Sequence, residues 1–140
     1  MTLICSFQIP GEPVGKGRPR MTTRGGKVRS FTPEKTASYE ALTIAAYRDA
    51  GGSGGIIESP VAVTLACQFA MPKSWSAKKR SMMTGAWCTK KPDADNVAKA
   101  VCDALNGVLW RDDAQVVDLS VEKRWCDGGG AVTVHVFEAV

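Results

Sequence analysis

The stretch Lys91–Gln115, KPDADNVAKAVCDALNGVLWRDDAQ, holds one short helical pattern with acidic residues at both of its ends. Residues 95–105 have the apolar spacing of an amphipathic helix, and the Asn-Gly pair that follows predicts its end. Four carboxylates lie off its apolar face, two at the start of the helix and two beyond its end: Asp93, Asp95, Asp112 and Asp113. Because the chain then returns as a strand, the two acidic pairs are predicted to converge.

Each acidic pair also has a purely structural explanation. Asp95 can cap the first helical amides, and Asp93 can favour the positive end of the helix dipole. Asp112 and Asp113 can form an ordinary turn before the strand. Converging carboxylates repel each other, however, and a bound cation relieves that repulsion. Hard oxygen ligands suit Mg²⁺, which keeps waters and phosphate oxygens in its shell, so the pattern favours phosphoryl chemistry.

The rest of the sequence predicts a mixed sheet with helices packed on it. Residues 61–71 alternate strictly, which is the period of a strand with one buried face. The other expected elements are strands at 3–9, 115–125 and 132–136, a long helix over about 32–50 that begins at Thr32 and Pro33, and a short helix within 74–83. This order does not alternate as in a doubly wound fold. We therefore expect one α+β domain over residues 1–140, with two main helices on a mixed sheet in two layers.

Two of these elements have a predicted apolar face. The long helix presents one stripe made of Tyr39, Leu42 and Ala46. The strand at 115–125 is predicted to point four side chains toward the core: Val117, Leu119, Val121 and Trp125. Residues 10–29 are predicted to form a loop. Trp110 is expected to pack behind the acidic turn at residues 112 and 113.

The composition limits the class of protein. With 44% hydrophobic and 23% charged residues among 140, it is that of an ordinary globular chain and does not indicate disorder. No apolar run approaches the length of a membrane-spanning helix, so no membrane partner is expected. The first ten residues have neither a basic leader nor a long apolar stretch, and they fit a strand better than a signal peptide. We therefore expect a cytoplasmic protein.

The 18 basic residues fall into three sets of six. One set occupies a Gly- and Thr-rich segment that contains no acid: Lys16, Arg18, Arg20, Arg24, Lys27 and Arg29. A second set leads up to the acidic motif: Lys73, Lys78, Lys79, Arg80, Lys90 and Lys91. Two basic segments around an acidic centre fit a polyanion that is held by its flanks and attacked at its middle. Solvated surface loops are the alternative explanation.

Lys99 lies one helical turn after Asp95 on the same face of the predicted helix. An intrahelical ion pair is the simplest role for it. In a metal site, its ammonium group would instead stabilise charge on a phosphate during phosphoryl transfer. Asp103, one further turn along, is a candidate to orient Lys99 or to form a plain salt bridge with it.

The motif Asp93-x-Asp95-Asn96-x-x-Lys99, followed by Asp103-Ala104-Leu105 and Trp110-x-Asp112-Asp113-x-Gln115-Val116, resembles the signature of the RusA family of Holliday junction resolvases. Both the residue types and their spacing agree with that signature. The segments 15–20, GKGRPR, and 71–75, MPKSW, are similar to the phage and prophage branch of the same family.

This resemblance implies a homodimeric endonuclease that uses Mg²⁺, or Mn²⁺ in its place, to introduce paired symmetric nicks across a four-way DNA junction in recombination and repair. By motif position, the metal-binding carboxylates are Asp93, Asp95 and Asp113. Together with Lys99, which matches the essential lysine of the family, they are the candidate catalytic residues. The candidate DNA-binding residues are Lys16, Arg18, Arg20, Lys90 and Lys91. The expected products have 5′-phosphate and 3′-hydroxyl ends.

Two other functions are compatible with the same residues. One is a Mg²⁺-dependent nuclease for flaps, forks or other branched DNA, which the same acids would serve equally well. The other is a catalytically silent junction-binding protein. The complete set of acids argues against the silent protein, because a pure binder gains affinity when it loses negative charge beside a phosphate.

Overall fold

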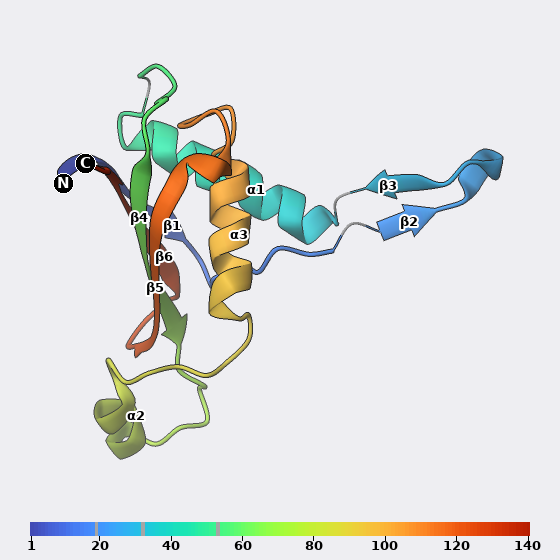
Figure 1. Cartoon of the computed structure of the whole chain (residues 1–140). Coiled ribbons are helices and arrows are strands. Elements are labelled where there is room, and N and C mark those ends of the chain that lie inside the picture. The colour runs from blue at the N-terminus through green and yellow to red at the C-terminus, as the bar shows by residue number, and fades with distance from the viewer. Residues whose placement is uncertain (19, 32, 53) are drawn as a thin grey trace.

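The computed structural model describes residues 1–18, 20–31, 33–52 and 54–140, so the helix start predicted at Thr32 lies outside the described residues. Its centre is a four-stranded sheet in the order β1-β6-β4-β5 (Figure 1). These strands are β1 (Thr2–Pro10), β4 (Val61–Ala70), β5 (Val116–Cys126) and β6 (Ala131–Glu138). β4 and β5 run parallel, whereas β6 runs antiparallel to both β1 and β4. The predicted mixed sheet is confirmed.

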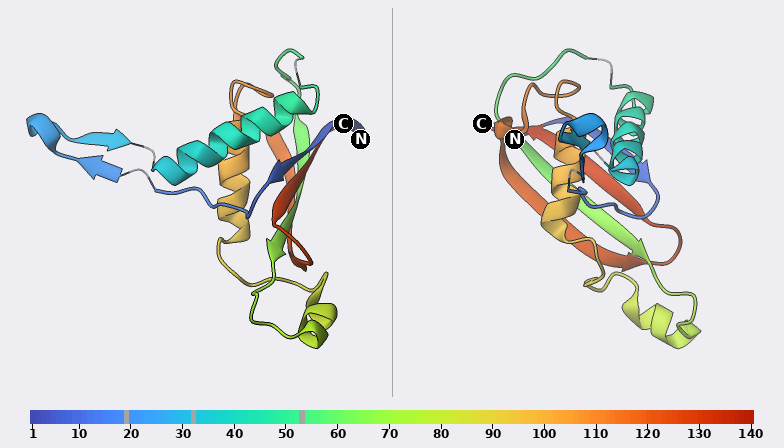
Figure 2. Two further views of the ribbon diagram at one scale, coloured as in Figure 1. Left: turned by 180° about the vertical axis from the view of Figure 1, so that it is seen from behind. Right: turned by 90° about the vertical axis from the view of Figure 1, so that its right-hand side faces the viewer.

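Two helices, α1 (Glu34–Asp49) and α3 (Ala94–Ala104), cover one face of this sheet (Figures 1 and 2). α3 packs through the residues that its period predicted, Val97 and Val101 together with Leu105 just past its end, all fully buried. They share one core with the inward side chains of β4 and β6. The α+β arrangement is confirmed. A short helix, α2 (Ala77–Met83), lies beyond one end of the sheet (Figure 1).

The predicted inward face of β5 is wrong in its first half. Val117 is 63% exposed because it is the extra residue at a register shift, where Val61 pairs with Val116 and Ala62 pairs with Asp118. Leu119 is 47% exposed, since β5 is the edge strand in the order of the described sheet. The first half of β5 therefore borders open surface and does not close the core.

The predicted stripe of α1 is wrong at Leu42, which is exposed. The buried residues of this helix are Thr36, Tyr39, Thr43 and Tyr47. Two of these four are threonines, so an apolar pattern points to the wrong side. Thr43 is completely buried, and its hydroxyl donates a hydrogen bond of 2.8 Å to the carbonyl of Tyr39. This bond offsets the free-energy cost of burying the hydroxyl.

Residues 10–29, predicted as a loop, contain most of a β-hairpin. β2 (Arg20–Thr22) pairs antiparallel with β3 (Arg29–Phe31), and a 3₁₀ turn (Arg24–Gly26) joins them. This hairpin projects away from the sheet and the helices as an extended arm (Figures 1 and 2). Strands of three residues are too short to show a reliable period of two, which explains why the pattern missed them.

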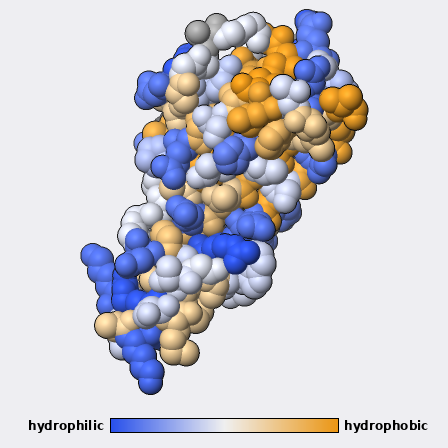
Figure 3. Space-filling model, turned by 90° about the vertical axis from the view of Figure 1, so that its left-hand side faces the viewer, coloured by the Kyte–Doolittle hydropathy of each residue, from blue (hydrophilic) through white to orange (hydrophobic). Residues whose placement is uncertain are grey.

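In the described part of the chain no helix covers the other face of the sheet, which faces the viewer in Figure 3. Hydrophobic side chains gather there toward the end away from α2 (Figure 3). A shallow hollow of about 230 Å³ lies on this face, with Met1, Ala62 and Phe137 among its lining residues. No helix in the described part of the chain is both long and apolar enough to cross a membrane.

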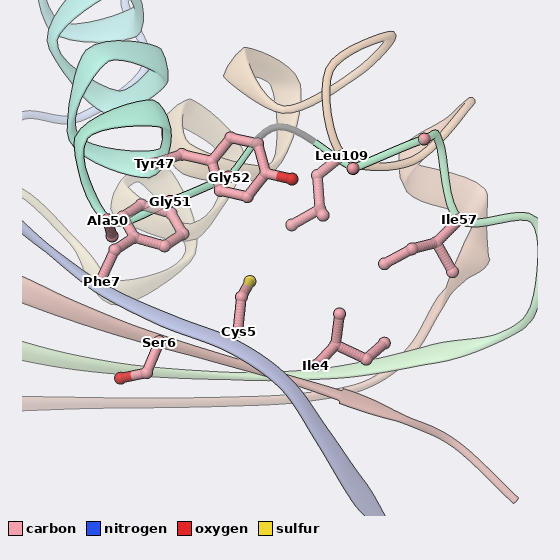
Figure 4. Close-up of a pocket in the computed structure, with 12 residues that line it drawn as sticks. Ile4, Cys5, Ser6, Phe7, Tyr47, Ala50, Gly51, Gly52, Ile57 and Leu109 are labelled. Carbon is pink, nitrogen blue, oxygen red and sulfur yellow. The ribbon is translucent and has the colours of Figure 1, made fainter.

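The hydroxyl of Tyr39 is a weak point in the core. Its oxygen is buried and, within the described residues, has no hydrogen-bond partner. Because an unsatisfied buried hydroxyl costs free energy, Tyr39→Phe is expected to raise the free energy of unfolding by about 1 kcal/mol. Urea denaturation measures this change. Tyr47→Phe is the matched control and should give no gain, since the Tyr47 hydroxyl faces a pocket (Figure 4). A loss of stability in Tyr39→Phe would contradict the prediction.

Candidate active site

A groove between α3 and the start of β5 brings three of the predicted residues together. It encloses about 280 Å³ and is lined by Asp95 and Lys99 from α3 and by Asp113 from the turn before β5. Its remaining lining residues are Ala98, Cys102, Val116 and Leu119. Asp95 and Lys99 share one helix face because they are four residues apart. The two ends of the Lys91–Gln115 stretch were predicted to converge, and Asp95 and Asp113 do so by lining the same groove.

The turn that carries Asp113 is held by its neighbours. The Asp112 carboxylate accepts a hydrogen bond of 3.0 Å from the amide of Ala114, while the Gln115 side chain accepts one from the amide of Asp112. This reciprocal cap closes a 3₁₀ turn over Asp113–Gln115. Gln115 also donates to the carbonyl oxygens of Ile57 and Ser59 at 2.8 and 3.1 Å. Asp112 thus has a structural task, and Asp113 is left free to line the groove.

Trp110 supports the same turn from behind. It is completely buried, and its indole N–H donates to Oδ1 of Asn106 at 3.0 Å. Its carbonyl accepts from the amide of Gly107 at 2.7 Å, so the loop that leaves α3 is closed on itself. The predicted packing of Trp110 is confirmed. Asp112 and Asp113 follow it directly, and their position depends on this closed loop.

Negative charge accumulates around Asp113. Its pKa is raised, mainly by a hydrogen bond with the side chain of Asp103, then by burial and by the charges of Asp103 and Asp112. Lys99 opposes this shift. Burial, together with the charges of Asp113 and Asp103, raises the pKa of the neighbouring Cys102 to about 12, so its thiol stays protonated. The groove therefore holds more carboxylates than its single lysine can balance.

The structure does not pair Asp103 with Lys99. Asp103 instead lies 3.4 Å from Nζ of Lys16, which also contacts Glu40 at 2.6 Å. None of the ion pairs in the described part of the chain involves Lys99. Its ammonium group thus remains available to a ligand in the groove. The sequence had placed Asp103 on the correct face but had not indicated its contact with Asp113.

The other predicted site residues lie around the groove or beyond it. Asp93 is the N-cap residue of α3, but its side chain makes no capping hydrogen bond and pairs with Lys91 at 3.0 Å. It does not line the groove. The carbonyl of Lys90 accepts a hydrogen bond of 2.6 Å from Lys123, while the Lys90 side chain is exposed. Arg18 is exposed where the chain enters the hairpin, and Arg20 belongs to β2.

The donor set of the groove fits a hard divalent cation. Asp95 and Asp113 offer carboxylate oxygens, and the raised pKa of Asp113 marks a site where one more positive charge is stabilising. Among the described residues, no three acidic, histidine or cysteine side chains are grouped as metal ligands. Two carboxylates suffice for Mg²⁺, whose remaining ligands are commonly waters and substrate phosphate oxygens.

A second pocket is unsuited to this chemistry. It encloses about 290 Å³ between β1, the end of α1 and the loop that follows α1. The side chains of Cys5, Tyr47 and Leu109 point into it (Figure 4). None of its lining residues in the described part of the chain is charged. Burial raises the pKa of Cys5, so this thiol is also a poor metal ligand.

Asp103 should control the acid limit of any reaction that needs the charged form of Asp113. A carboxyl with a raised pKa takes up its proton at a higher pH, so activity is lost early as pH falls. Asp103→Asn removes one negative charge and is expected to move the acid limb of the kcat/KM profile to lower pH. The exposed Asp127→Asn is the control and should leave the limb in place. An unmoved limb in Asp103→Asn would show that another group sets it.

Comparison with known proteins agrees with this geometry. Residues 10–136 match the family model described as endodeoxyribonuclease RusA. The chain is also 42% identical over 124 residues to the uncharacterized protein YqaN of Bacillus subtilis, with 84% of each chain covered. RusA-type endonucleases generally depend on a divalent metal, which suits the acidic groove, and the family implies binding to branched DNA. The resemblance carried by the acidic motif is confirmed, and the chain belongs to the RusA family of endodeoxyribonucleases.

Proposed function

We propose that this protein is a Mg²⁺-dependent, structure-selective endonuclease that resolves Holliday junctions by paired symmetric nicks in recombination and repair. The observation that carries the proposal is the meeting of Asp95, Lys99 and Asp113 in one groove of a RusA-family chain. The proposal includes Mn²⁺ as an ion that can replace Mg²⁺, and a cytoplasmic location for the protein.

The chain's own groups have distinct tasks in this proposal. Asp95 and Asp113 would hold the cation, with Asp93, the N-cap residue of α3, as a third acid. A bound cation would supply positive charge beside the scissile phosphate and activate a water. Lys99, which is free of carboxylate partners in the described part of the chain, stabilises the charge that builds on the phosphate oxygens. Asp103 and the Asp112 cap keep Asp113 in place.

DNA contacts are proposed at two basic segments. Lys90 and Lys91 lie just before α3, and Arg18 and Arg20 lie where the chain enters the hairpin. Their charges would supply affinity through phosphates and make binding sensitive to salt. Lys16 belonged to the same predicted set, but its contacts with Glu40 and Asp103 compete with a role in DNA binding.

A homodimer is part of the proposal. A four-way junction has approximate two-fold symmetry, so two copies related by a two-fold axis can present one groove to each of two strands. The hydrophobic side chains on the open face of the sheet offer a surface for association (Figure 3). Sedimentation equilibrium of the purified chain measures the state directly, and a monomer at micromolar concentration would contradict this part.

The test of the function is cleavage of a labelled synthetic four-way junction beside a linear duplex and a flap, with Mg²⁺ or EDTA. Wild type and Asp95→Asn are compared. Symmetric nicks on the junction alone, lost in EDTA and in the variant, are the expected result. Equal cutting of all three substrates would replace the resolvase by a general branched-DNA nuclease. Tight junction binding without cutting would show a binding protein and overturn the catalytic proposal.

A further inference from the structure

The β2–β3 hairpin is the feature that the cleavage groove leaves unexplained. It projects from the body of the protein (Figures 1 and 2), and each of its residues with a described burial is exposed. Two of its large apolar residues, Met21 and Val28, are 64% and 65% exposed. A two-stranded ribbon of this length is marginally stable by itself, and contact with a partner would stabilise it.

The charge of the hairpin identifies the chemistry of that partner. Between Glu12 and Glu34 the chain has six basic residues and no acid. Three of the six lie beyond β2, at or after the tip of the hairpin: Arg24, Lys27 and Arg29. The hairpin has one aromatic residue, Phe31 at its base, and residues 18–30 have none, whereas proteins that hold single strands stack successive bases on aromatic rings. The sequence of the arm therefore fits the phosphates of a duplex better than unpaired bases.

The base of the arm is fixed to the helix that carries the catalytic candidates. The amide of Lys16 donates to the carbonyl of Asn96 at 3.0 Å, and Asn96 follows Asp95 directly. Gly15 makes this approach possible, since a Cβ there would lie 2.9 Å from Cβ of Pro92. The Lys16 side chain ties the same point to Glu40 of α1 and Asp103 of α3.

A second anchor holds the arm to α1. The amide of Gly17 donates a hydrogen bond of 2.9 Å to the buried hydroxyl of Thr36. The arm thus starts from a rigid base beside the groove. Counted from the anchored Gly17 to Gly25, the arm reaches at most about 26 Å at the rise of a strand, or about eight base pairs of duplex. A two-stranded ribbon also has the width that the major groove admits.

We propose that the β2–β3 hairpin is a duplex clamp, whose tip grips one arm of the branched DNA up to about eight base pairs from the cleavage groove, beyond the end of an arm of about 6 base pairs. This inference rests on the proposed function, because it assumes that branched DNA occupies the groove. The clamp supplies affinity and orientation, and it contributes no group to the reaction. It predicts that binding depends on the length of the duplex arms.

The test measures binding of the catalytically silenced Asp95→Asn protein to junctions whose arms are about 6 or about 15 base pairs long, each closed by a hairpin loop. Arg24→Gln/Lys27→Gln is made in this background. On long-armed junctions, the double variant is expected to bind about tenfold more weakly than its parent. The slope of the logarithm of the association constant against the logarithm of the salt concentration should become less steep by about 2. With short arms the double variant should bind like its parent. Lys35→Gln/Arg48→Gln, at two exposed positions of α1, removes the same charge as a control and should show no dependence on arm length.

The outcomes separate the clamp from the proposed function. Equal binding of the hairpin variant and its parent to long-armed junctions would overturn the clamp and assign the arm to another polyanion, such as an acidic protein. An equal loss of affinity for short-armed and long-armed junctions would mean that the hairpin only attracts DNA by its general positive charge. That result would also overturn the clamp. Cleavage by the wild-type protein tests the proposed nuclease function independently of these binding measurements. If the hairpin contributes to binding of long-armed junctions but the wild-type protein never cleaves them, the clamp is supported and the proposed nuclease function is contradicted.

Discussion

Replacing Asp113 by Asn is expected to lower the rate of junction cleavage at least about a thousandfold while the protein stays folded. Asp113 lines the groove with Asp95 and Lys99, and its raised pKa shows that it sits where negative charge is least balanced. The amide keeps the shape of the side chain and removes the charge that would hold a cation. Single-turnover cleavage at saturating enzyme measures the loss, and circular dichroism with thermal melting checks the fold.

Asp112→Asn is the matched control for this prediction. It makes the same replacement of a carboxylate by an amide at the adjacent residue. The asparagine side chain can still accept the hydrogen bond from the Ala114 amide. Cleavage is therefore expected to fall less than about tenfold. Asp112→Ala removes the cap and is expected to cost about 1 kcal/mol of stability. If Asp112→Asn were as inactive as Asp113→Asn, the assignment of the two acids would have to be exchanged.

The fold could be predicted wherever one strong period ran long enough. β4 and α3 each bury one continuous face, so alternation and helical spacing placed them within a residue or two of their ends. The errors came where burial does not follow hydropathy. α1 buries Thr36 and Thr43 and exposes Leu42, and Val117 is displaced by a register shift that no local pattern records.

The candidate site could be predicted in part for a related reason. Asp95, Lys99 and Asp113 depend on two local elements, a helix and the turn after it, and their meeting follows once β5 packs beside α3. The contact of Asp103 with Asp113 and the anchor from Lys16 to Asn96 depend on tertiary packing. The sequence signalled the basic segment by its charge but not its hairpin geometry, because β2 and β3 are too short to show a period.

Trp110→Ala is expected to lower the free energy of unfolding by about 3–5 kcal/mol, a large share of the total stability of a domain of this size. The side chain is fully buried, and its removal also leaves Oδ1 of Asn106 without the indole donor. Urea denaturation measures the change. Trp87→Ala is the control: Trp87 is 61% exposed and stacks on Arg124, so about 1 kcal/mol or less should be lost.

Trp110→Phe separates the structural and the catalytic consequences of the same residue. Phenylalanine keeps most of the buried ring and loses the bond to Asn106, so the variant should remain folded at 20 to 25 °C after a loss of about 1–3 kcal/mol. Because Trp110 closes the loop that precedes Asp113, a small shift of that turn is expected to lower kcat about tenfold with little change in KM. Single-turnover cleavage and junction binding measured on one preparation distinguish the two constants. An unchanged kcat in a destabilised Trp110→Phe would mean that Gln115, through Ile57 and Ser59, holds Asp113 in place without help from the tryptophan.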